Sequence, residues 1–76
     1  MNPRARQETA VAVNGAPRTI ASGVTIADLV QEVLVDVEAR AVAVARNGEI
    51  VPRAEWPRCV LLDGDAVEIV RPVQGG

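Results

Sequence analysis

Short apolar runs, each closed by glycine, proline or asparagine, dominate the pattern along the chain. Residues 9–13 favour a strand and place Val11 and Val13 on one face, which is expected to point toward a core. Asn14-Gly15 follows and predicts a tight turn, because both central positions of a type I′ turn need a positive φ. Residues 18–21 predict the return strand, so the chain is expected to open with a β-hairpin.

One segment instead has the period of a helix. Thr25 precedes it and predicts the N-cap, and Asp28 suits the positive end of the helix dipole. Asp28 and Glu32 lie opposite the apolar stripe, so we interpret them as a solvated face rather than a catalytic pair of acids. The stripe has the spacing i, i+3, i+4, i+7 and i+8 and consists of Ile26, Leu29, Val30, Val33 and Leu34.

The second half of the chain returns to strand patterns. Residues 41–46 predict a central strand, and Asn47-Gly48 predicts a second tight turn into residues 49–51. Pro52 is expected to end that strand, since proline has no N–H to donate to a sheet.

An irregular crossing is expected between this hairpin and the last strand. For residues 53–58 we predict one helical turn at most, because Pro57 should push Trp56 away from the α region. Residues 66–70 predict the last strand, and Pro72 is expected to stop regular structure.

This order predicts the α+β class, with one mixed sheet of about five strands and one main helix across one face. The other face of the sheet should be partly exposed, and an exposed face of small apolar residues is a natural docking surface.

Composition excludes several kinds of partner. The chain has 76 residues, a net charge of −2, scattered arginines and one aromatic residue. Nucleic-acid binding needs basic patches or stacking rings, so it is not expected. No apolar run is long enough to span a membrane, and the start lacks the apolar core of a signal peptide. We therefore expect a cytoplasmic protein with no membrane partner.

Metal chemistry is equally unexpected. The chain has no His and a single Cys, whereas a zinc site needs several such ligands. One cysteine makes no internal disulfide, which fits a reducing compartment. We interpret Cys59 as a small buried hydrophobe, and Trp56 as the large packing residue of a small core.

The sequence ends with Gly75-Gly76. A thin glycine arm with a free carboxylate can enter a narrow active site of another protein, because glycine has no Cβ. A frayed end would look the same, so these two residues alone leave both interpretations open.

Further motifs make the chain resemble the ThiS-type sulfur carriers of thiamine biosynthesis. The resemblance covers about residues 9–76, and its most specific part is the Asn-Gly-x-x-Val-Pro-Arg-x-x-Trp run. The matching segments are Val13 to Gly15, Thr25 to Leu29, Asn47 to Arg53, Trp56, Asp63 to Asp65, Val67 to Val70 and the terminal Gly75-Gly76.

This resemblance implies the β-grasp fold, in a domain over residues 9–72 with a disordered extension 1–8 and a flexible tail 73–76. It implies a carrier without enzymatic activity, catalytic residues or a cofactor of its own. A ThiF-type adenylating enzyme would activate Gly76 while Gly75 lets the tail enter the active site. A sulfur donor such as a cysteine desulfurase would then make a thiocarboxylate, and a ThiG-type thiazole synthase would accept the sulfur.

Other roles stay open from the residues. The N-terminal extension is longer than is usual in the family, and the proline-containing segment 71–74 also resembles the molybdopterin carriers of the MoaD type. Carriers for molybdopterin or cysteine synthesis, a ubiquitin-like protein modifier, and a binding module with an inert tail are the alternatives.

Overall fold

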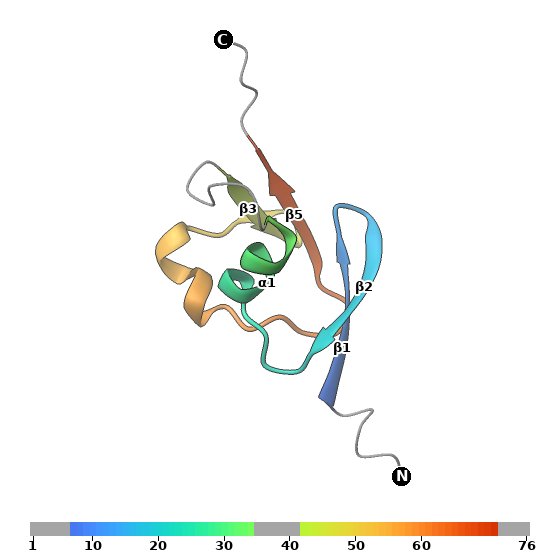
Figure 1. Ribbon diagram of the computed structural model, residues 1–76. Coiled ribbons are helices and arrows are strands. Elements are labelled where there is room, and N and C mark those ends of the chain that lie inside the picture. Colours follow the sequence, from blue (N-terminus) through green and yellow to red (C-terminus); the bar gives the residue numbers. More distant parts are fainter. Residues whose placement is uncertain (1–6, 35–41, 72–76) are drawn as a thin grey trace.

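Figure 1 shows the computed structural model of the chain, which describes residues 7–34 and 42–71. Five strands form one sheet in the order β2-β1-β5-β3-β4. In the centre, β5 runs parallel to β1 and antiparallel to β3. The sheet is therefore mixed, as predicted, with bounds β1 Glu8–Val13, β2 Ala16–Ala21, β3 Ala43–Arg46, β4 Glu49–Ile50 and β5 Ala66–Val70.

Two Asn-Gly turns build the two hairpins, as the sequence predicts. Asn14 and Gly15 have φ values of 51° and 84°, and Asn47 and Gly48 have values of 51° and 86°. The strands differ from the prediction by one or two residues. β2 begins at Ala16 rather than residue 18, because a two-residue turn lets pairing start at once between the residues that flank it.

The helix α1 covers Ile26–Val33 and begins with a capping box. The Asp28 N–H donates to Thr25 Oγ1 at 3.2 Å, and the Thr25 N–H donates to Asp28 Oδ2 at 3.1 Å. These reciprocal bonds satisfy two N–H groups that the first turn would otherwise leave unpaired. Thr25 is thus the N-cap that the sequence predicts.

The segment 53–58 corrects the sequence prediction of one helical turn at most. It forms a six-residue 3₁₀-helix, η3, over Arg53–Arg58, with Pro57 inside it. The Glu55 N–H donates to Pro52 O, and the Cys59 N–H donates to Trp56 O, so two turns follow each other. Pro57 is the second residue of the later turn, where its fixed φ fits and its missing N–H is not needed.

One face of the sheet is covered by α1 and η3, and the core lies between these layers (Figure 1). Trp56 is 5% exposed, and its Nε1–H donates to Val51 O at 2.9 Å, which confirms it as a packing residue. The buried apolar side chains are Val11, Val13, Ile20, Ile26, Leu29, Val30, Leu34, Val42, Val44, Trp56, Leu61, Val67 and Ile69.

Candidate functional site

The predicted reactive residues, Gly75 and Gly76, lie outside the described residues, as does Pro72. The strand that leads toward them is described to its end at Val70, with Arg71 as the next residue. Because β5 is the central strand, the chain leaves the sheet at its middle and not at an edge. Arg71 therefore follows a strand that has neighbours on both sides.

The face of the sheet that lies away from α1 has mostly small apolar side chains, with the exposed Glu68 side chain on its central strand. In β5, Val67 and Ile69 are buried, while Ala66, Glu68 and Val70 alternate with them and are exposed. The register continues this open face across the neighbouring strands. Its members are Ala10 and Ala12 on β1, Ala43 and Ala45 on β3, Ile50 on β4, and Ala66, Glu68 and Val70 on β5.

Two of the apolar side chains on this face are large and exposed. Ile50 is 70% exposed and Val70 is 57% exposed, although both are apolar. The alanine side chains between them are short, so another protein can approach the backbone of the sheet closely. We call the residues given above the open face, which agrees with the docking surface that the sequence predicts.

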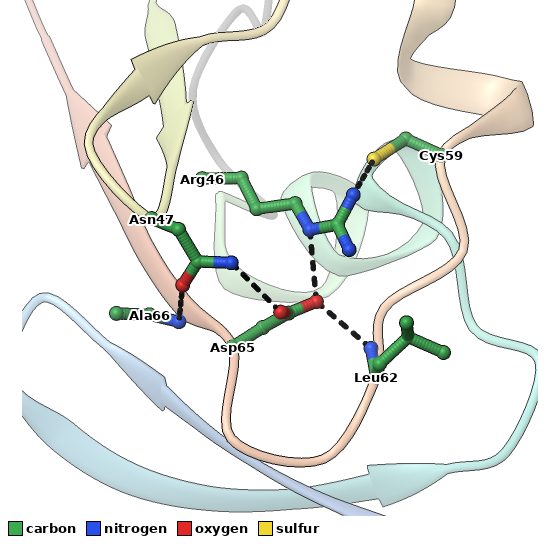
Figure 2. Close-up of polar contacts among 6 residues, drawn as sticks. All are labelled: Arg46, Asn47, Cys59, Leu62, Asp65 and Ala66. Atoms are coloured by element: carbon green, nitrogen blue, oxygen red, sulfur yellow. Dashed lines mark hydrogen bonds and ion pairs between the residues drawn. The ribbon is translucent and has the colours of Figure 1, made fainter.

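A polar cluster joins the start of β5 to the β3–β4 hairpin (Figure 2). The Asp65 carboxylate lies at its centre and is only 6% exposed. Its Oδ2 accepts from Arg46 Nε and from the Leu62 N–H, both at 2.9 Å, and its Oδ1 accepts from Asn47 Nδ2 at 2.9 Å. Both oxygens are therefore satisfied within the protein.

These contacts determine how Asp65 titrates. Burial by itself raises the pKa of a carboxyl group. Here the hydrogen bonds from Leu62, Asn47 and Arg46, with the positive charge of Arg46, outweigh burial and hold the pKa of Asp65 below its ordinary value. The same contact with Asp65 raises the pKa of the Arg46 guanidinium. The cluster thus holds a stable ion pair, and we interpret it as structural.

Cys59 lies at the border of this cluster. Its Sγ accepts from Arg46 Nη1 at 3.5 Å, and the residue is partly buried against the core (Figure 2). The sequence predicts a small buried hydrophobe at this position, and the structure shows a side chain that packs against the core but is only partly buried. A hollow of about 240 Å³ adjoins it, lined by Arg46, Asn47, Glu49, Ile50, Val51, Pro52, Glu55 and Cys59.

The acids of α1 have structural partners. Asp28 closes the capping box, and Glu32 Oε1 accepts from Arg18 Nη2 at 3.1 Å on the surface. Among the described residues, no group of three His, Cys, Asp or Glu side chains could hold a metal ion. None of the helices in the described ranges is long and apolar enough to cross a membrane.

Asn14 and Asn47 form the two tight turns, and their side chains also bond to β5, which the sequence did not predict. The Asn14 side chain pairs with the backbone of Ile69, since Oδ1 accepts from the Ile69 N–H at 2.8 Å and Nδ2 donates to Ile69 O at 3.3 Å. Asn47 Oδ1 accepts from the Ala66 N–H at 2.9 Å (Figure 2). The Asn-Gly motifs predict the turns, but only the folded chain places both amides beside β5.

Comparison with known proteins relates the chain to one family. The model of the ThiS family matches residues 7–76. The sulfur carrier protein ThiS of Thermus thermophilus is 41% identical over 64 residues, which are 84% of this chain and 95% of that protein. A thiazole synthase of Paramagnetospirillum magneticum is also 41% identical over 64 residues, but this chain spans only 19% of its length.

Solved structures give the same relationship. The crystal structure of the thiamine biosynthesis protein ThiS from Geobacter metallireducens has a TM-score of 0.74 at 33% identity, with 90% of this chain and all 100% of that one covered. A solution structure of a thiamine biosynthesis protein from the same organism has a TM-score of 0.71. These matches confirm the β-grasp fold implied by the sequence motifs.

Proposed function

Because this chain belongs to the ThiS family, we propose that it is a sulfur carrier of thiamine biosynthesis and that the Gly76 carboxylate carries the sulfur. The carrier is a co-substrate of other enzymes and needs no catalytic side chain of its own. A carrier needs no reactive side chains, and the Arg46–Asp65 ion pair and the Thr25–Asp28 capping box fit this role because their polar groups bond within the fold.

The chemistry begins with activation of the carboxylate. A carboxylate is a poor electrophile, so a ThiF-type enzyme joins Gly76 to the α-phosphate of ATP and releases pyrophosphate. The resulting acyl-adenylate has AMP as a good leaving group. Gly75 has no Cβ, which lets the backbone pass through a constricted channel to the adenylation site.

Sulfur transfer follows on the same carbon. The terminal sulfur of a cysteine persulfide, supplied by a cysteine desulfurase or a related donor, attacks the acyl carbon and displaces AMP. Cleavage of the remaining S–S bond by a second thiol leaves a thiocarboxylate on Gly76. A thiazole synthase takes the sulfur, and the match to a stretch within a thiazole synthase chain supports that enzyme as the acceptor.

The observation that most supports a carrier is the position of Val70. It is the last residue of β5, it is 57% exposed, and it belongs to the open face. A partner that packs on the open face therefore also covers the point where the chain leaves toward Gly76. We propose that the adenylating enzyme docks on this face and receives the tail from there.

Intact mass tests the chemistry. After co-expression with its adenylating enzyme and a sulfur donor, the chain should gain the mass of one sulfur-for-oxygen exchange at its C-terminus. Deletion of Gly76 should abolish this gain and leave the circular dichroism spectrum unchanged, because β5 ends at Val70. Isopeptide-linked conjugates instead of a thiocarboxylate would show a protein modifier, and sulfur transfer by the truncated chain would refute the proposal.

The docking face has a separate test. Ile50→Arg places a charge on the open face at a 70% exposed position, so the fold should persist. We expect the KM of the adenylating enzyme for the carrier to rise about tenfold or more, since an unpaired charge buried in the interface costs more than the about 1.4 kcal/mol that corresponds to a tenfold change. Gln31→Arg, on the exposed side of α1, is the matched control and should leave the KM unchanged.

A further inference from the structure

We propose that Asn14 is a positioning residue for the C-terminal tail, because its side chain completes the pairing of β5 where β1 has already ended. This inference rests on the proposed sulfur-carrier function. It concerns the end of β5, which the structure describes, and the distance along the chain from there to Gly76.

The ladder between β1 and β5 is short. Residue pairs join the two strands only at Ala12–Ala66 and Val13–Val67. The Asn14 N–H still donates to Val67 O at 2.8 Å. At Asn14 the chain then enters the turn with a φ of 51°, so the backbone of β1 moves away from β5.

The next backbone groups of β5 on this side belong to Ile69, two residues beyond Val67. In a parallel ladder these groups would bond to the continuing neighbour strand. The Asn14 amide replaces that strand, since its oxygen accepts from the Ile69 N–H and its nitrogen donates to the Ile69 carbonyl. One primary amide thus extends the ladder after the partner strand has turned.

The contact between Asn14 and Ile69 lies at the C-terminal end of β5, from which the chain continues toward Gly76. Ile69 precedes the last strand residue, Val70, and Gly76 lies seven residues further along the chain than Ile69. On the other side, Ala43 pairs with Val70. With both sides held, β5 ends at a fixed place and in a fixed direction relative to the open face.

A docked partner needs that fixed end. When the open face is bound, the Gly76 carboxylate must reach one place, and an end of β5 that is fixed in position and direction raises its effective concentration there. If Asn14 is lost, Ile69 loses both hydrogen bonds on its β1 side, so only β3 holds the end of β5 and the Gly76 carboxylate is less well directed. Docking itself is unchanged, because Asn14 is not part of the open face.

The chain offers a matched pair of variants. Asn14→Gly removes the amide and keeps the turn, because glycine adopts positive φ freely. Asn47→Gly does the same in the second Asn-Gly turn, where the amide bonds to Ala66 at the start of β5 and to the Asp65 carboxylate just before it. Both variants lose side-chain bonds to β5, but only the first loses them near the tail.

The test is steady-state adenylation by the ThiF-type enzyme, with the full-length carrier as the varied substrate. For Asn14→Gly we expect kcat to fall about threefold to tenfold at an unchanged KM, because small misplacements of a reacting group are costly. Asn47→Gly should keep the wild-type kcat at temperatures where it is folded. Hydrogen exchange of the Ile69 amide should accelerate in Asn14→Gly and not in Asn47→Gly.

Three results would overturn the inference: a wild-type kcat in Asn14→Gly, an equal fall of kcat in both variants, or a rise in KM without a change in kcat. The equal fall would show a general effect of stability. If the wild-type carrier is not adenylated at all, the proposed function is wrong. If the wild type is adenylated and Asn14→Gly matches it, the sulfur-carrier function stands and only the positioning role is refuted.

Discussion

Replacement of Asp65 by Asn should strongly destabilise the domain. Oδ1 of Asp65 accepts from Asn47, and Oδ2 accepts from Arg46 and Leu62. An asparagine side chain has an oxygen on one side only. Either orientation of the amide therefore places an NH₂ group against a donor that now has no acceptor.

The magnitude follows from these contacts. A hydrogen bond to a charged group contributes about 1.5–3 kcal/mol, and an unsatisfied buried donor costs a further about 1–3 kcal/mol. The Arg46 side chain is 30% exposed, so water can replace part of its lost contact. We expect Asp65→Asn to lower the free energy of unfolding by about 2–4 kcal/mol, against a total of only about 3–5 kcal/mol for so small a core.

Urea unfolding followed by Trp56 fluorescence measures this loss, since the ring is buried and is the only aromatic side chain. Asp63→Asn is the matched control. Asp63 accepts one bond, from the exposed Ala10 N–H at 2.8 Å, so its loss should cost under about 1.5 kcal/mol. Equal losses in the two variants would refute the reasoning that Asp65 organises the start of β5.

Acid unfolding, the helix cap and the indole ring give three further predictions. Folding lowers the pKa of Asp65, so the stability that this carboxylate contributes is complete above the unfolded pKa of about 3.9 and is lost as pH falls through the folded pKa. Below about pH 4, the free energy of unfolding of the wild type should therefore fall more steeply with pH than that of Asp65→Asn. Parallel curves of stability against pH for the two proteins would contradict this. Thr25→Ala removes the cap and should cost about 1 kcal/mol in thermal or urea unfolding, whereas Thr25→Ser should retain most of it. Trp56→Ala should cost about 3–5 kcal/mol, and a variant that stays as stable as wild type but loses binding to the adenylating enzyme would assign the ring to an interface instead.

The elements that depend only on neighbouring residues could be predicted from the sequence. The Thr25 cap and the apolar stripe of α1 need only neighbouring residues, and the two Asn-Gly turns depend on the positive φ that these residues accept. For residues 53–58 the sequence predicts one helical turn at most, because the residue before a proline is disfavoured in the α region. In the observed pair of successive turns, Pro57 occupies a position that favours proline, and Trp56 is buried in the core.

Contacts between distant residues could not be predicted in this way. Asp63-Gly64-Asp65 indicates a turn, but nothing in that motif shows that Asp65 binds Arg46 and Asn47 from another hairpin. Asn14 is 55 residues from Ile69 along the chain, and its amide reaches that backbone only because β5 inserts beside β1.

The sequence by itself determined the α+β class, the single helix, the hairpin turns and, through the motifs from Asn47 to Trp56, the carrier family. Only the tertiary structure decided that β5 is the central strand, that Val70 ends it on the open face, and that two turn asparagines and one buried aspartate hold it. The reason is physical: caps, turns and periodicity depend on neighbours in the chain, whereas the environment of β5 depends on strands that meet only after the chain has folded.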